Sequence, residues 1–233
     1  MKISRRALSG LLLATGLRQA PAEASLDLLL VLAVDASGSV NRERFELQQH
    51  GYATAFRDPR VIGAIGGGPL GGIAVTMTQW TGPTLQADVV PWMAVTDAHS
   101  AEAFAAAVDG TRRVLFGGGT SLSGAIDHSM ALLSACPFQG TRRVIDISGD
   151  GANNRGRPAE VARDTAVAAG IVINGLPIPW IEPDLAEHYR GQVIGGAGAF
   201  VVVANDYAAF GTAIVTKLVA EIAWRGDGVR AAG

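Results

Sequence analysis

Long apolar runs alternate with amphipathic segments along this chain. Residues 26–34 form a near-continuous apolar run interrupted only by Asp27, and the runs at 144–148, 171–176 and 199–204 have the same character. Runs of this kind are typical of strands that are buried on both faces of a parallel sheet. The pattern therefore predicts four buried strands at these positions.

Between the runs, apolar residues recur at three- and four-residue spacing, which predicts amphipathic helices. The first of them is expected to end at Asp58-Pro59, because the residue before a proline is disfavoured in the helical region. The predicted helices cover residues 45–56, 100–113, 122–133, 158–169 and 210–222.

Two further segments have the pattern of a β-hairpin. Residues 73–80 alternate in a strand-like way, Gly82-Pro83 indicates a turn, and residues 85–95 form a second strand in which Pro91 is tolerated only at a sheet edge. Strands that alternate with helices predict an α/β fold, with a doubly wound, mainly parallel sheet, one antiparallel edge strand and helices on both faces. We expect one domain, at residues 25–233.

The N-terminal residues 1–24 have the pattern of a signal peptide. A basic start with Lys2, Arg5 and Arg6 precedes an uncharged apolar stretch at 7–17, and an A-x-A cleavage site follows at 22–24. The arginine pair also resembles a twin-arginine signal, with a general secretory signal as the alternative. Either signal predicts a periplasmic or secreted protein.

Charge and composition narrow the classes of partner. Residues 1–24 hold four of the 19 Lys and Arg and one of the 21 Asp and Glu, so the remainder has 15 basic and 20 acidic residues and a net charge of −5. This balance argues against a nucleic-acid partner. The long uncharged stretch at 61–87 is broken by Gly, Pro, Thr and Gln, so we expect no stable membrane span in the mature chain.

Oxygen-rich residues follow the predicted elements in three places, at 35–39, 119–121 and 148–151. In an open α/β sheet, ligands bind outside the carboxyl ends of the strands. Hydroxyls and carboxylates without Cys or His are hard ligands, which suit Mg²⁺, Mn²⁺ or Ca²⁺. Each motif alone has an ordinary explanation as a helix cap or a turn. Their joint occurrence, in order, favours a cation site.

Together, Asp-x-Ser-x-Ser at 35–39, Gly-Gly-Thr at 118–120 and Asp-Gly at 150–151 resemble the metal-ion-dependent adhesion site (MIDAS) of a von Willebrand factor A (vWA) domain, which has a Rossmann-like fold. The stretches at 146–154 and 193–196 resemble an uncharacterised bacterial branch of that fold. The resemblance implies direct metal ligands at three hydroxyls, of which that of Thr120 binds in the high-affinity state, and water-mediated ligands at two carboxylates. These residues are Ser37, Ser39, Thr120, Asp35 and Asp150. Gly149 departs from the family pattern and leaves open how closely Asp150 approaches the metal.

The resemblance implies an exported, divalent-metal-dependent protein-binding module. Its metal, Mg²⁺ with Mn²⁺ or Ca²⁺ as alternatives, is completed by an Asp or Glu of a protein partner. The alternative is a Mg²⁺- or Mn²⁺-dependent hydrolase acting on phosphate or other esters. No histidine pairs in sequence with a nucleophile, and 119–124 lacks the spacing of a nucleophile elbow, so the sequence favours binding over catalysis. A scaffold with a degenerate metal site is a third possibility.

Overall fold

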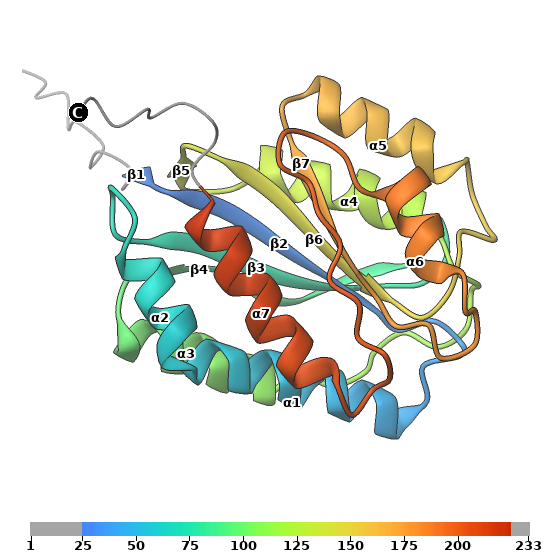
Figure 1. Ribbon diagram of the computed structural model, residues 1–233, viewed down its shortest axis with the longest axis horizontal. Helices are drawn as coiled ribbons and strands as arrows, with labels where there is room; N and C mark the ends of the chain where they lie inside the picture. Colours follow the sequence, from blue (N-terminus) through green and yellow to red (C-terminus); the bar gives the residue numbers. More distant parts are fainter. Residues whose placement is uncertain (1–24, 225–233) are drawn as a thin grey trace, which may run out of the picture.

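The computed structural model describes residues 25–224, so the predicted signal peptide lies outside the described residues. A five-stranded sheet with the order β4-β3-β2-β6-β7 forms its centre (Figure 1). Strands β3, β2, β6 and β7 are parallel, and β4 pairs antiparallel to β3 at one edge. The predicted mainly parallel sheet with one antiparallel edge strand is confirmed. The strands are β2 (Leu28–Asp35), β3 (Ile73–Trp80), β4 (Gln86–Val95), β6 (Arg143–Gly149) and β7 (Val172–Pro177).

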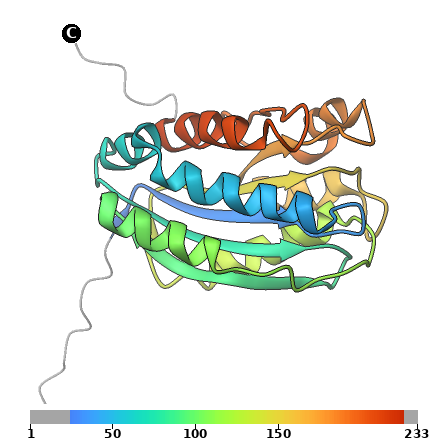
Figure 2. The ribbon, with the colours of Figure 1, turned by 90° about the horizontal axis from the view of Figure 1, so that it is seen from below.

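Helices cover both faces of the sheet, as predicted, and Figure 2 shows α1 and α3 in front of one face. A short parallel pair, β1 with β5, lies beside the main sheet. No helix of the described residues has the length and apolar character needed to span a membrane. The remaining elements are β1 (Ser25–Leu26), α1 (Arg42–Arg57), α2 (Pro59–Gly66), α3 (Ala98–Asp109), α4 (Leu122–Ser134), β5 (Gln139–Gly140), α5 (Ala159–Ala168), α6 (Leu185–His188), the π-helical turn η1 (Tyr189–Val193) and α7 (Phe210–Ala223).

Strand β2 is buried on both of its faces, which explains why its sequence is apolar at successive positions. All eight of its residues are buried. Leu28, Leu30 and Leu32 pack into the core under α1, α2, α3 and α7, whereas Leu29 and Val31 pack into the core under α4 and α5. Successive side chains of a strand point to opposite faces of the sheet. Because helices cover both faces, the even-numbered and the odd-numbered positions of β2 must both be apolar.

Two expectations from the sequence need correction. Asp58-Pro59 ends α1 as predicted, but the same pair begins the unpredicted α2, because Asp58 Oδ1 accepts a hydrogen bond from Arg60 N at 2.8 Å. The predicted strand at 199–204 is wrong. That segment runs beside β7 and is joined to it by backbone hydrogen bonds as far as Ala204 N with Pro177 O, but these form one isolated bridge, between Gly175 and Val201, and no strand.

Candidate metal site

The three predicted motifs converge at the carboxyl ends of the parallel strands, at the end of the sheet that lies to the right in Figure 1. Asp35 is the last residue of β2 and Asp150 directly follows β6, and these two strands are neighbours in the sheet. Thr120 directly precedes the cap of α4. Parallel strands end at one edge, so residues far apart in sequence meet there.

The loop after β2 directs two serine hydroxyls toward each other. Asp35 is fully buried, and its Oδ1 accepts a 2.7 Å hydrogen bond from Ser37 N. This turn leaves Ser37 Oγ and Ser39 Oγ 3.2 Å apart. The cap of α1 is Asn41, whose Oδ1 accepts from Arg44 N at 2.9 Å. Since Asn41 caps the helix, Ser39 is available for another role.

Asp150 meets both parts of this loop. Its Oδ1 accepts a 2.5 Å hydrogen bond from Ser39 Oγ, and its backbone N donates to Asp35 Oδ2 at 3.3 Å. The hydroxyl of Tyr207, which precedes α7, donates to the other oxygen, Oδ2, at 2.8 Å. Asp35, Ser37, Ser39 and Asp150 are therefore joined by hydrogen bonds in one cluster.

Gly149 is explained by this close approach. A Cβ at this position would lie 2.9 Å from Asp35 Oδ2, 3.0 Å from Tyr189 Oη and 3.1 Å from Trp80 Cζ2. Contacts this short would force the neighbouring atoms apart. The departure from the family pattern therefore lets β6 bring Asp150 against Asp35.

Thr120 lies beside the cluster, at the end of a glycine-rich loop. Gly117, Gly118 and Gly119 all have positive φ (78°, 92° and 80°), a conformation that favours glycine. Thr120 N donates to Asn154 Oδ1 at 2.9 Å, and Thr120 Oγ1 lies 3.3 Å from the point that a Cβ on Gly151 would occupy. The buried Thr120 hydroxyl therefore faces the residue after Asp150.

A second cap frees the Thr120 side chain, as Asn41 frees Ser39. Ser121 is the cap of α4, and its Oγ accepts from Gly124 N at 3.1 Å. The helix-cap explanation of the motif therefore applies to neighbours of the proposed ligands and not to Ser39 or Thr120.

The electrostatics of the site favour a cation. Burial and the neighbouring Asp150 charge together raise the pKa of Asp35 to about 7. Two acidic side chains held this close without a cation repel each other when both are ionised. Tyr189 Oη is also buried here without a hydrogen-bond partner in the described residues. No group of three His, Cys, Asp or Glu side chains suited to a metal occurs between residues 25 and 224, so a cation here would need the hydroxyls as ligands. This oxygen-only donor set fits Mg²⁺, Mn²⁺ or Ca²⁺.

Sequence reasoning missed the residues that brace the site. Arg113 Nη2 donates to Ala36 O at 2.9 Å and to Ser37 O at 2.8 Å, and Arg44 Nη1 donates to Ser39 O at 2.6 Å. Arg44 also lies 5.3 Å from the ring centre of Trp180 and 5.5 Å from that of Tyr207. None of these residues has a spacing that links it to the motifs, so only the fold reveals them.

The arrangement of strands, helices and loops is that of a vWA-like domain. A family model described as "Protein of unknown function (DUF1194)" matches residues 25–226. The chain therefore belongs to this family. A search of the curated proteins gives no match.

Solved structures with the same fold share little sequence with this chain. A von Willebrand factor type A protein from Catenulispora acidiphila has 17% identity and a TM-score of 0.59, over 85% of this chain and 43% of that one. Proximal thread matrix protein 1 from the mussel byssus, with a zinc-occupied MIDAS motif, has 15% identity and a TM-score of 0.59, over 86% and 49%. BatB from Bacteroides thetaiotaomicron has 18% identity and a TM-score of 0.52, over 84% and 98%. This chain thus spans less than half the length of the first two.

Proposed function

We propose that this protein is an exported, divalent-metal-dependent protein-binding module. Ser37, Ser39 and Thr120 bind the cation directly through their hydroxyls, and Asp35 and Asp150 bind it through water. The observation that carries this proposal is the buried pair of Asp35 and Asp150 beside hydroxyls that cap no helix.

The charge of the site explains why a partner would complete it. Two carboxylates balance the charge of a divalent cation, and if they act through water the metal remains electrophilic. It then attracts a further anionic oxygen, which an Asp or Glu of a protein partner supplies. We propose Mg²⁺ as the cation, because magnesium is bound by few carboxylates and keeps several waters. The mussel protein holds zinc in the corresponding motif, which makes zinc a necessary competitor in any test.

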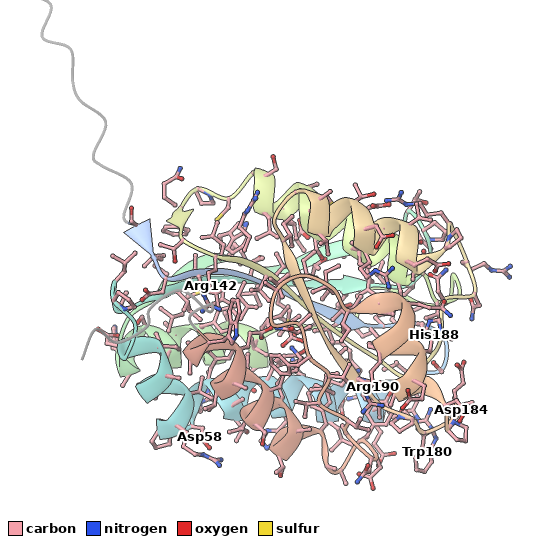
Figure 3. All side chains as sticks on the ribbon, turned by 45° about the horizontal axis from the view of Figure 1, so that its top comes forward. Asp58, Arg142, Trp180, Asp184, His188 and Arg190 are labelled. Atoms are coloured by element: carbon pink, nitrogen blue, oxygen red, sulfur yellow. The ribbon has the colours of Figure 1, made fainter. Side chains whose placement is uncertain are left out.

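Features around the site also suit a protein partner. Arg44 and Arg113 place positive charge beside the loop at residues 35–39, here called the metal loop, and this charge would steer an acidic surface toward it. Phe116 is 73% exposed and contacts Arg113, with the guanidinium 4.9 Å from its ring centre. Trp180 is 56% exposed and lies on the segment after β7, near Asp184 and His188 (Figure 3). Exposed aromatic side chains of this kind are enriched in protein interfaces.

The hydrolase alternative has less support. His128 Nε2 contacts Asp88 at 2.8 Å and His50 contacts Thr54, so these two histidines are engaged outside the cluster. His188 Nε2 lies 3.4 Å from Asn153 N, in the loop after Asp150, and its contact is with that backbone and not with the carboxylates. A general base must reach the proton that it abstracts, directly or through one water. Metal-dependent turnover in a phosphatase and esterase screen, lost in Ser37→Ala, would favour this alternative over binding.

Thermal unfolding tests the metal site directly. At about 100 times its dissociation constant, a cation that binds only the folded state stabilises it by about 2.7 kcal/mol, a rise in Tm of about 5–10 °C for a chain of this size. We expect Mg²⁺ to raise Tm in the wild type and in Asp164→Asn, an exposed carboxylate on α5. Asp35→Ala should lose the response. Equal Tm values with and without metal in the wild type would refute the site.

Partner binding is tested separately. The protein is used as bait in periplasmic extract, with Mg²⁺, with EDTA and as Asp35→Ala. We expect a partner protein to be captured by the wild type with Mg²⁺, and to be absent with EDTA and with Asp35→Ala. Prey that are indifferent to EDTA would indicate a scaffold with a degenerate site.

A further inference from the structure

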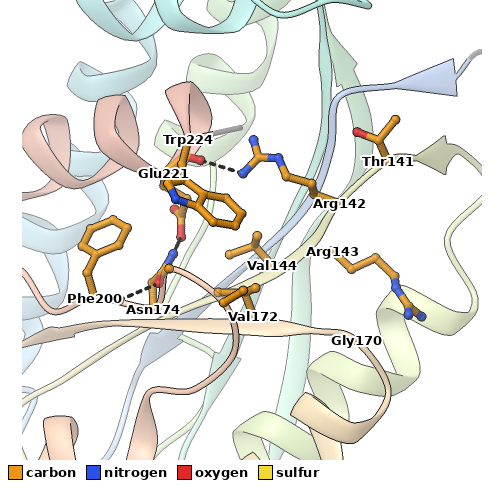
Figure 4. Close-up of a pocket in the computed structure, with 12 residues that line it drawn as sticks. Thr141, Arg142, Arg143, Val144, Gly170, Val172, Asn174, Phe200, Glu221 and Trp224 are labelled. Carbon is orange, nitrogen blue, oxygen red and sulfur yellow. Dashed lines mark hydrogen bonds between the residues drawn. The ribbon is translucent and has the colours of Figure 1, made fainter. Parts of the chain in front are cut away.

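A second buried polar cluster lies between α7 and the sheet, away from the proposed metal site. Lys217 Nζ on α7 is 2.7 Å from Asp146 Oδ2 on β6, and both side chains are 0% exposed. Glu221, one turn further along α7, has its Oε1 3.4 Å from the same nitrogen. Asn174 Nδ2 on β7 donates to this oxygen at 2.6 Å, as Figure 4 shows. The cluster thus joins three elements within the core.

This cluster has more acid than base. Two carboxyl groups, Asp146 and Glu221, share one amine. Lys217 Nζ contacts Oδ2 of Asp146 at 2.7 Å, whereas Oδ1 of Asp146 and Oε2 of Glu221 accept no hydrogen bond from the described residues. Buried charges that lack hydrogen bonds are costly, so the cluster favours states in which charge is removed.

The pKa of Asp146 also favours loss of charge from the cluster. Burial raises the pKa of Asp146 to about 7, and the neighbouring Glu221 charge adds to the rise, whereas Lys217 opposes it. The ring centre of Phe200 lies 5.7 Å from Lys217 Nζ, so an aromatic ring borders the amine. The carboxylic acid form of Asp146 therefore becomes accessible beside the Lys217 nitrogen, which lies 2.7 Å from it.

We propose that Lys217 and Asp146 are joined by an isopeptide bond, and that Glu221 is the residue that transfers the proton. The bond would link α7 covalently to β6. This inference does not depend on the proposed metal site or on any partner.

The reaction is a condensation that needs no oxidant or cofactor. A proton passes from the Lys217 ammonium to the Asp146 carboxylate, which gives an amine and a carboxylic acid. The Nζ lone pair attacks Cγ of Asp146 and forms the C–N bond. Glu221 accepts a proton from the nitrogen and returns it to the departing hydroxyl as the C–O bond breaks. The products are one amide and one water, and Glu221 regains its starting state.

Geometry and solvation both favour this step. Groups held in a near-attack arrangement, with reacting atoms about 3–3.5 Å apart, react with effective molarities far above those in solution. The contact of 2.7 Å from Nζ to a carboxyl oxygen holds the amine beside Cγ. A cavity of about 200 Å³, lined by Glu221, Asn174 and Phe200, borders the cluster and can receive the water that is released (Figure 4). The amide then replaces two buried charges.

Mass spectrometry of the purified protein tests the bond without any variant. We expect an intact mass about 18 Da below that calculated for the same N-terminus, the mass of one water. After trypsin, peptide 144–155 should be found joined to peptide 191–225, uncleaved at Lys217. An unchanged mass, or a loss of water confined to a linear peptide, would overturn the proposal.

Variants of the three residues test which side chains form the proposed amide bond. Asp146→Asn should still form the amide but lose ammonia, so its mass should fall by about 17 Da instead of 18. Lys217→Arg keeps the positive charge and should show no loss. Glu221→Gln should leave a larger unlinked fraction than the wild type, at equal time after synthesis. Circular dichroism identifies the variants that fold. A branched peptide that persists in Lys217→Arg would assign the link to another residue and refute the proposal.

Discussion

Tyr207 holds one oxygen of Asp150 while Ser39 holds the other. The tyrosine hydroxyl donates to Oδ2 at 2.8 Å, and the serine hydroxyl donates to Oδ1 at 2.5 Å. The carboxylate is therefore fixed from two loops that are far apart in sequence. Tyr207 lies in the segment that leads into α7, so the position of this helix and the orientation of a proposed metal ligand are physically connected.

Tyr207→Phe should weaken metal binding without removing it. The ring that packs near Arg44 remains, but Asp150 loses its hydrogen-bond donor. Residues that orient metal ligands typically contribute 10–100-fold to affinity, so we expect the dissociation constant for Mg²⁺ to rise by about that factor. Isothermal titration calorimetry measures it. An unchanged constant would show that Ser39 alone orients Asp150.

Two neighbouring polar residues should separate metal binding from helix capping. Ser39→Ala removes a proposed ligand and should abolish the rise in Tm with Mg²⁺. Asn41→Ala removes the cap of α1 and should lower stability by about 1 kcal/mol, with the metal response retained. Thermal unfolding of both variants, with and without Mg²⁺, checks this. The reverse pattern would assign the motif to helix capping.

Gly149→Ala should be destabilising because of the atoms that surround this glycine. The added methyl would lie 2.9 Å from Asp35 Oδ2 and 3.1 Å from Trp80 Cζ2, and such overpacking costs about 1–3 kcal/mol. The matched control is Gly63→Ala in α2, where nothing lies within 4 Å and alanine should stabilise the helix by up to about 1 kcal/mol. Urea denaturation gives both values. A neutral Gly149→Ala would mean that β6 and the metal loop move apart easily.

The exposed aromatic side chains should affect the partner and not the metal. Phe116→Ser removes a large apolar contact from the rim, so binding of a captured partner should weaken by at least about tenfold, as for interface positions that cost more than 1 kcal/mol. Its Tm response to Mg²⁺ should equal that of the wild type. Val161→Ser, which changes an exposed apolar residue on α5, serves as the control. Equal effects of the two substitutions on partner binding would argue against a specific contact between Phe116 and the partner.

Much of the site follows from the sequence because parallel strands end together. Once Asp35 and Asp150 are placed after two buried strands, the fold brings them to one edge with no further information. The residues that brace them follow no such rule. Tyr207 lies 57 positions after Asp150, in an irregular segment, and its role depends on how that segment crosses the sheet.

The errors in the predicted elements have similar causes. Asp58 ends one helix and caps the next, so a residue that indicates a stop also marks a start. The apolar run at 199–204 is partly buried beside β7, and hydrophobicity alone does not distinguish such packing from a strand with a full hydrogen-bond ladder. In both cases the local pattern is real, and tertiary contacts decide the structure.

The ends of the described chain have a practical consequence. Strand β1 and the last turn of α7 lie at the end of the sheet opposite to the proposed metal site (Figure 1). A dye, an affinity label or an attachment to a solid support placed beyond either element would therefore face away from the acidic cluster. The protein can be immobilised in one orientation on a sensor surface, with the edge proposed to bind the cation directed into the solution.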